Sequence, residues 1–248
     1  NGGWLGILFS GCAGTVESVA ADYPGIGTRR EGEYPRLYHN QRDGSFRDVA
    51  ADLGLATGLM TMGSNFGDLD NDGWLDFYAG TGNPDYRSLV PNRMFRNDEG
   101  RFFQDVTTSG GFGHLQKGHG VAFADVDHDG DQDVYIKVGG AYTGDSFQSV
   151  LFENPGHANH WITLFLVGVE SNRSAIGARI KLTVAGPSGP REIHASVSTG
   201  SSFGGSPLRR QIGLGKASRI ERLEIRWPSG TVQQFEDLAV DQFLEIRE

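Results

Sequence analysis

The stretch that decides the fold is Phe66-Gly67-Asp68-Leu69-Asp70-Asn71-Asp72-Gly73, because the chain contains it twice. The second copy is Phe123-Ala124-Asp125-Val126-Asp127-His128-Asp129-Gly130, and the step from Asp68 to Asp125 is 125 − 68 = 57. In both copies an Asp stands at every second position and a Gly closes the run. A duplicated pattern at a fixed distance indicates a structural unit that is repeated along the chain.

The same step joins landmarks outside these acidic runs. Asn40, Asn97 and Asn154 each end a short run that contains an aromatic residue, and Asp48-Val49 recurs as Asp105-Val106. Chance clusters of acidic residues would not keep register with these landmarks. The repeat is therefore a structural unit and not a local bias in composition.

A fainter copy stands at the start of the chain, where Asn1 to Gly6 resembles Asn71 to Asp76. The step from Trp4 to Trp74 is 74 − 4 = 70, so this unit is longer than the others by 70 − 57 = 13. We expect the additional residues between Asp22 and Pro35. Gly6 stands where the later copy has Asp76, so we expect this first turn to bind no ion.

Each unit predicts four short strands separated by Gly, Asp and Asn turns. In the central unit they are expected at 66–68, 75–79, 93–97 and 102–106. Four strands in a unit of this length are typical of a β-propeller blade, and a closed ring usually has 4–8 blades. About three units fit into residues 1–157, so the sequence predicts an all-β chain that begins with a partial β-propeller.

The periodicity ends near Pro155-Gly156-His157, which we take as a domain boundary. Longer strand patterns follow and predict a second β module over residues 158–248, either a β-sandwich or a barrel-like fold. A short helix is expected at Leu238–Gln242. The strand patterns of this module lie at 162–167, 179–184, 191–197, 220–227 and 243–247.

The acidic runs predict two calcium sites, because Ca²⁺ takes 6–8 oxygen ligands and tolerates irregular geometry. Gly73 and Gly130 are expected to allow the sharp turn. An EF-hand needs Glu at the twelfth loop position, where this chain has Ala79 and Ile136, so we expect sites set between strands. Backbone carbonyl ligands are expected from Trp74 or Asp131. The expected side-chain ligands are Asp68, Asp70, Asp72 and Asp76 in the first loop and Asp125, Asp127, Asp129 and Asp133 in the second.

These motifs resemble the FG-GAP or VCBS repeats of integrin α-subunit propellers and of many secreted bacterial proteins, over roughly residues 1–157. The second module is similar to the ASPIC/UnbV domain over about residues 159–235. The motifs that carry this second likeness are Asn159-His160-Trp161, Ser171 to Ala178, Gly213-Leu214-Gly215 and Arg226 to Gly230. The pairing resembles that in the family of proteins similar to cartilage acidic protein. It implies calcium-stabilised propeller blades in a secreted or cell-surface protein.

Composition and net charge limit the classes of partner that we expect for this chain. A formal net charge of −9 argues against nucleic acid, whose binding depends on clustered Lys and Arg. No apolar run approaches the ~20 residues that span a bilayer, so we expect a soluble chain without membrane insertion. The lone Cys12 excludes an intrachain disulfide. The expected partner is an extracellular protein or a glycan of unknown identity.

We expect no catalytic site. Gly200 to Gly204 matches the G-x-S-x-G pattern of α/β-hydrolases, but Gly205, Ser206 and Pro207 follow where a helix would be needed. His128 is expected to point to solvent. Two alternatives remain open at this point: an enzyme acting on extracellular polysaccharide, with its site at a blade rim or between the modules, and a purely structural stalk.

Overall fold

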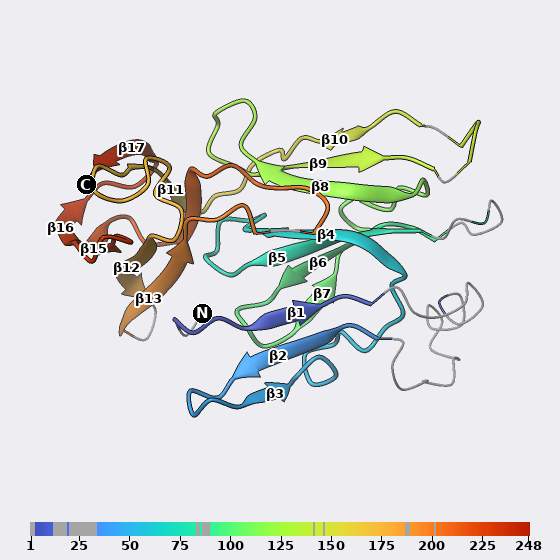
Figure 1. Cartoon of the computed structure of the whole chain (residues 1–248), viewed down its shortest axis with the longest axis horizontal. Coiled ribbons are helices and arrows are strands. Elements are labelled where there is room, and N and C mark those ends of the chain that lie inside the picture. The colour runs from blue at the N-terminus through green and yellow to red at the C-terminus, as the bar shows by residue number, and fades with distance from the viewer. Residues whose placement is uncertain are drawn as a thin grey trace.

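Every element in the described part of the computed structural model is a strand. The structure describes residues 3–11, 19, 34–82, 85, 90–140, 142–145, 147–186, 189–200 and 202–248. Figure 1 shows the repeat sheets side by side on the right and the C-terminal module on the left. In the repeat region the strands are β1 (Ile7–Phe9), β2 (Arg36–Asn40), β3 (Phe46–Asp48), β4 (Thr61–Gly67), β5 (Asp76–Thr81), β6 (Arg93–Asn97), β7 (Phe103–Asp105), β8 (Gly118–Ala124), β9 (Asp133–Val138) and β10 (Val150–Phe152).

The sheets of the repeat region reproduce the register of the sequence repeat. The central sheet has the order β4-β5-β6-β7 and forms a complete four-stranded blade, with antiparallel pairing throughout. The sheet β1-β2-β3 corresponds to the last three strands of that blade, and β8-β9-β10 corresponds to the first three. The prediction of an all-β fold with about three propeller-like blades is confirmed. The extra residues expected between 22 and 35 lie outside the described residues.

Apolar side chains between neighbouring blades hold this region together. One cluster joins the first two blades and contains Leu55, Phe77 and Phe95, and the rings of Phe77 and Phe95 stack at 4.8 Å. A second cluster joins the last two blades and contains Tyr78 and Phe123. Every residue of β5 is buried because neighbouring sheets cover both of its faces. Each blade thus depends on its neighbours, as in repeat folds generally.

The C-terminal module is a β-sandwich. Its sheets have the orders β14-β11-β17 and β13-β12-β15-β16, with β11 and β17 parallel. Ile162 and Leu164 of one sheet and Leu182 and Ile225 of the other belong to a single buried core. The strands are β11 (His160–Val167), β12 (Arg179–Gly186), β13 (Gly189–Ser196), β14 (Arg210–Gly215), β15 (Ile220–Arg226), β16 (Val232–Leu238) and β17 (Gln242–Arg247).

Two details of the predicted second module are wrong. No helix forms at Leu238–Gln242, because β16 ends at Leu238 and β17 begins at Gln242. The sequence patterns also missed β14 and β16. No helix in the described part of the chain is long and apolar enough to cross a bilayer.

The segment between β13 and β14 leaves the sandwich and lies across the first strands of two blades, as the orange trace in Figure 1 shows. Ser202 and Ser64 exchange backbone hydrogen bonds of 3.1 and 3.3 Å, and the Val121 N–H donates to the Phe203 carbonyl at 3.1 Å. Gly63 and Gly120, one repeat apart, both lie so close to this segment that a Cβ would crowd its backbone. The chain of the second module is therefore built into the repeat region.

Candidate metal centre

The two acidic loops, 68–76 and 125–133, have the same backbone conformation. Asn71 and His128 adopt φ values of 54° and 66°, and Gly73 and Gly130 adopt 85° and 94°. The left-handed region at the glycine positions is costly for other residues, which confirms the expected role of the two glycines. The loops therefore turn sharply and bring alternate side chains to one side.

The last Asp of each loop braces the turn. Both oxygens of Asp76 accept backbone hydrogen bonds, from Leu69 and Asn97, each at 2.7 Å. One repeat later, Asp133 accepts from Val126 and Asn154, each at 2.9 Å. The recurring Asn is thus the residue whose amide fixes the end of the loop.

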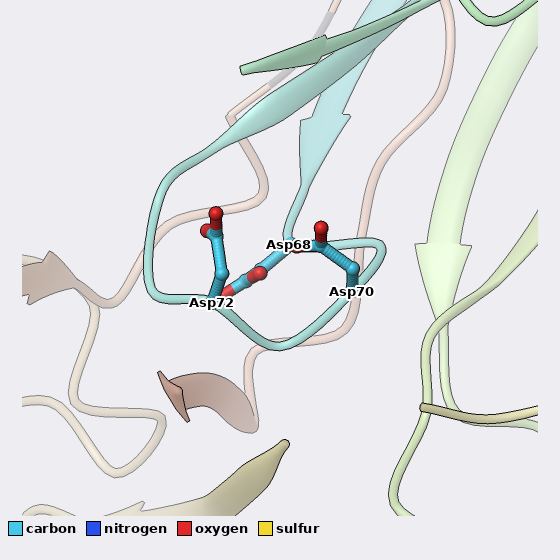
Figure 2. A group of neighbouring side chains, drawn as sticks. All are labelled: Asp68, Asp70 and Asp72. Atoms are coloured by element: carbon cyan, nitrogen blue, oxygen red, sulfur yellow. The ribbon is translucent and has the colours of Figure 1, made fainter. Parts of the chain in front are cut away.

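The first three aspartates of each loop converge. Carboxylate oxygens of Asp68, Asp70 and Asp72 lie within 4.8 Å of one another, and Figure 2 shows the three side chains on the inner side of the loop's curve. The second loop groups Asp125, Asp127 and Asp129 in the same way. Asp76 and Asp133, which the sequence assigned as ligands, lie outside these two groups.

Several oxygens in the groups are buried without a hydrogen-bond partner. They are the Oδ1 atoms of Asp68, Asp70 and Asp125. Asp68 and Asp125 are each only 3% exposed. A buried acceptor without a partner costs about 1–3 kcal/mol, and more when it is charged. A cation inside the loop would satisfy these oxygens.

The electrostatics of the first loop point the same way. Burial and the neighbouring carboxylates of Asp72 and Asp70 raise the pKa of Asp68 well above its ordinary value. Burial and the charge of Asp70 raise the pKa of Asp72 to about 6. Arg191 and Arg96 only partly offset this repulsion, so the loop resists full ionisation, whereas a divalent cation would remove the repulsion.

The two groups differ in exposure. In the first loop Asp68 is buried and its two partners are half-buried, whereas in the second loop Asp127 and Asp129 are exposed. Arg96 lies 3.1 Å from an oxygen of Asp70. The first site is thus the more enclosed of the two.

The two predicted carbonyl donors have side chains engaged elsewhere. The Trp74 ring lies under the Arg191 guanidinium at 5.5 Å. Asp131 accepts a 2.8 Å hydrogen bond from the Asn71 side chain, which also donates to the Gly130 carbonyl at 2.9 Å. The two loops are therefore tied directly to each other.

Other residues at the loops were missed from the sequence. Gln132 Oε1 accepts from the Asp68 amide at 2.9 Å, and Asn159 of the second module donates to the Asp70 carbonyl at 2.7 Å. The His128 ring lies 5.5 Å from the ring of Phe243, although the residue is exposed as expected. Such contacts depend on how distant segments dock, and no spacing in the sequence reveals them.

The donor set suits a hard cation. Carboxylate oxygens are the ligands that Ca²⁺ and Mg²⁺ prefer, and a flexible loop with three acidic groups matches the irregular coordination of Ca²⁺ better than the strict octahedron of Mg²⁺. Such an ion would satisfy the oxygens of Asp68, Asp70 and Asp125 that have no hydrogen-bond partner. The residues present therefore fit a calcium ion.

Comparison with known protein families finds two matches. Residues 14–79 match the FG-GAP-like repeat, a range that contains the first acidic loop. Residues 168–248 match the ASPIC and UnbV domain, which takes in β12 to β17. No curated protein matches the chain. The chain therefore combines an FG-GAP-like repeat region with an ASPIC and UnbV domain.

Proposed function

We propose that this chain is a calcium-binding, extracellular module that binds a protein or a glycan and carries out no catalysis. Two Ca²⁺ ions rigidify the loops 68–76 and 125–133, and Asp68, Asp70 and Asp72 hold the first while Asp125, Asp127 and Asp129 hold the second. Millimolar calcium outside cells is the setting in which such sites fill.

One observation carries the proposal: buried carboxylate oxygens without a partner recur at the same place in two loops that are one repeat apart. Asp68 Oδ1 and Asp125 Oδ1 are these atoms. Recurrence in register argues for a shared ligand, because an accidental packing defect would not recur at the equivalent position of the next unit. Each ion brings two positive charges to a chain with a formal net charge of −9.

Calorimetric titration tests the proposal. We expect two Ca²⁺ per chain, with one lost in Asp70→Asn and the other lost in Asp127→Asn. Each filled site should raise the unfolding free energy by about 2.7 kcal/mol at a hundredfold excess of Ca²⁺ over its Kd, so the two sites of the parent should together add about 5.4 kcal/mol. In chelator that gain should disappear for the parent. Absence of calcium binding by the parent would refute the proposal.

A further inference from the structure

The first acidic loop is held from outside by the C-terminal sandwich. The Gly213 N–H of β14 donates to Asp68 Oδ2 at 3.1 Å, and the Gly215 N–H donates to the Asn71 carbonyl at 2.9 Å. The Asn159 side chain donates to the Asp70 carbonyl at 2.7 Å. Three donors from one module thus hold three positions on the rim of the loop in the other.

The contact to Asp68 orients one of the three carboxylates that converge in the first loop. Oδ2 accepts two backbone hydrogen bonds, one from Gly73 of its own loop at 2.9 Å and one from Gly213. Oδ1 has no partner and belongs to a residue that is only 3% exposed. Loss of the Gly213 donor would remove one of these two hydrogen bonds and would therefore weaken the hold on the orientation of the carboxylate.

Backbone approaches backbone at this contact. A Cβ on Gly213 would lie 2.3 Å from Asp68 Oδ2 and 2.3 Å from the carbonyl carbon of Asn71. From the other side, a Cβ on Gly73 would lie 2.8 Å from the Gly213 carbonyl oxygen. Neither position has room for a side chain without separating the loop from β14.

The second loop is held differently. Arg209 donates to the Asp125 backbone carbonyl at 2.7 Å, Gln211 donates to the Gly130 carbonyl, and the Trp161 ring packs against Gly130. The Asp125 carboxylate is held within its own loop, by the Gly130 amide at 3.2 Å and by the backbone of His128. In the described structure, the C-terminal module therefore contacts the backbone of the second loop but orients none of the carboxylates of Asp125, Asp127 and Asp129.

We propose that the first calcium site is composite: the ASPIC and UnbV domain completes it, with Gly213 as a positioning residue, whereas the second site is formed by the repeat region alone. This inference rests on the proposed function. Because coupling between two binding events is reciprocal, calcium in the first loop must also strengthen the docking of β14. The ion thereby fastens the two modules together.

Calcium titration of Gly213→Ala tests this directly, with Gly205→Ala as the matched control. A Cβ at Gly205 would meet Thr199 at an ordinary contact distance of 3.4 Å and leaves Asp68 untouched. We expect Gly213→Ala to weaken one of the two sites by about tenfold or more, the scale of one hydrogen bond to a charged group, and to leave the other site unchanged. Gly205→Ala should keep both affinities.

Hydrogen exchange on the parent chain gives a second readout that does not require the Gly213 variant to fold. Ca²⁺ should slow exchange across residues 210–215 relative to chelator. The slowing should persist in Asp127→Asn, which disables the second site, and vanish in Asp70→Asn, which disables the first.

The outcomes separate the two proposals. If calcium fills both loops while Gly213→Ala keeps both affinities, or while exchange across residues 210–215 ignores the ion, the composite site is wrong and the calcium-binding function stands. If the parent takes up no calcium at all, the proposed function fails and the composite site fails with it.

Discussion

At the scale of single residues, the sequence was sufficient to find the acidic positions but not their separate roles. Six of the eight aspartates named from the spacing converge into two groups. Asp76 and Asp133 brace the loops through backbone amides that lie 7 and 21 positions away in the chain. Spacing alone does not reveal this bracing role, because strand pairing is what brings Asn97 and Asn154 to the ends of the loops.

Glu248 is a second residue whose role appears only in the fold. Its carboxylate accepts hydrogen bonds from the successive amides of Val169, Glu170 and Ser171 and from the hydroxyls of Ser171 and Ser229. Partial loss of hydration opposes ionisation, but these hydrogen bonds prevail and lower the pKa of Glu248 to about 2. The ionised group thus closes the sandwich by joining the end of β17 to two turns.

Glu248→Gln should therefore lower the melting temperature at pH 7. A lowered folded pKa stabilises the protein above the unfolded value of about 4.3, and this contribution is lost as the pH falls toward 2. The difference in melting temperature between parent and variant should shrink across that window. Glu245→Gln, at an exposed position of β17, is the control. A difference that stays constant from pH 7 to pH 2.5 would contradict this account of Glu248.

At the scale of elements, the repeat was predictable because its strands are short, regular and in register, whereas β14 and β16 were not. In β16 the apolar residues Val232, Phe235 and Leu238 recur every third position, which is not the alternation of a half-buried strand. β16 is an edge strand, paired with β15 alone in its sheet. Its partner, not its own pattern, decides its structure.

The repeat also supplies a matched pair of ion pairs. Arg36 binds Asp48 in the first blade, and Arg93 binds Asp105 one repeat later. The Arg36 side chain is 42% exposed and the Arg93 side chain 8%. Solvent screens the first pair, while loss of the buried arginine leaves its partner uncompensated.

Arg93→Met should accordingly cost about 3 kcal/mol of unfolding free energy, and Arg36→Met less than about 1 kcal/mol. Arg93 also donates to Thr57 and lies over the Phe95 ring, which adds to the loss. Urea denaturation of the two variants measures both values. Equal costs in the two blades would show that burial does not govern these pairs.

At the scale of the whole molecule, the two modules form one interlocked unit. Ser206, from the segment between β13 and β14, accepts hydrogen bonds from the Asn65 side chain at 2.8 Å and from the Phe123 amide at 3.3 Å. These two residues belong to different blades, so one hydroxyl joins three parts of the molecule. The sequence showed the Gly- and Ser-rich segment but gave no sign of its docking.

Ser206→Ala should lower the unfolding free energy by about 1–3 kcal/mol, because two donors lose their acceptor. The parent should melt in a single calorimetric transition, and the variant should melt in a single transition at lower temperature. Ser218→Ala, at an exposed turn, should leave the transition in place. Two separate transitions in the parent, with neither moved by Ser206→Ala, would mean that the modules are independent.

The docking of the two modules explains a role of the residues that carried the family resemblance. Asn159, Trp161, Gly213 and Gly215 of the second module all contact the acidic loops of the repeat region. What defines the second module in sequence is thus partly what joins it to the first. The docking of the second module and the geometry of the acidic loops therefore depend on the same contacts.

The most direct test of calcium binding by the acidic loops is a structure from crystals grown in millimolar Ca²⁺, with anomalous diffraction to locate the ion. The account predicts a peak within about 2.3–2.6 Å of carboxylate oxygens of Asp68, Asp70 and Asp72, with Asp68 Oδ1 among them, and an equivalent peak in the second loop. Carboxylates turned outward, with no peak in either loop, would contradict it.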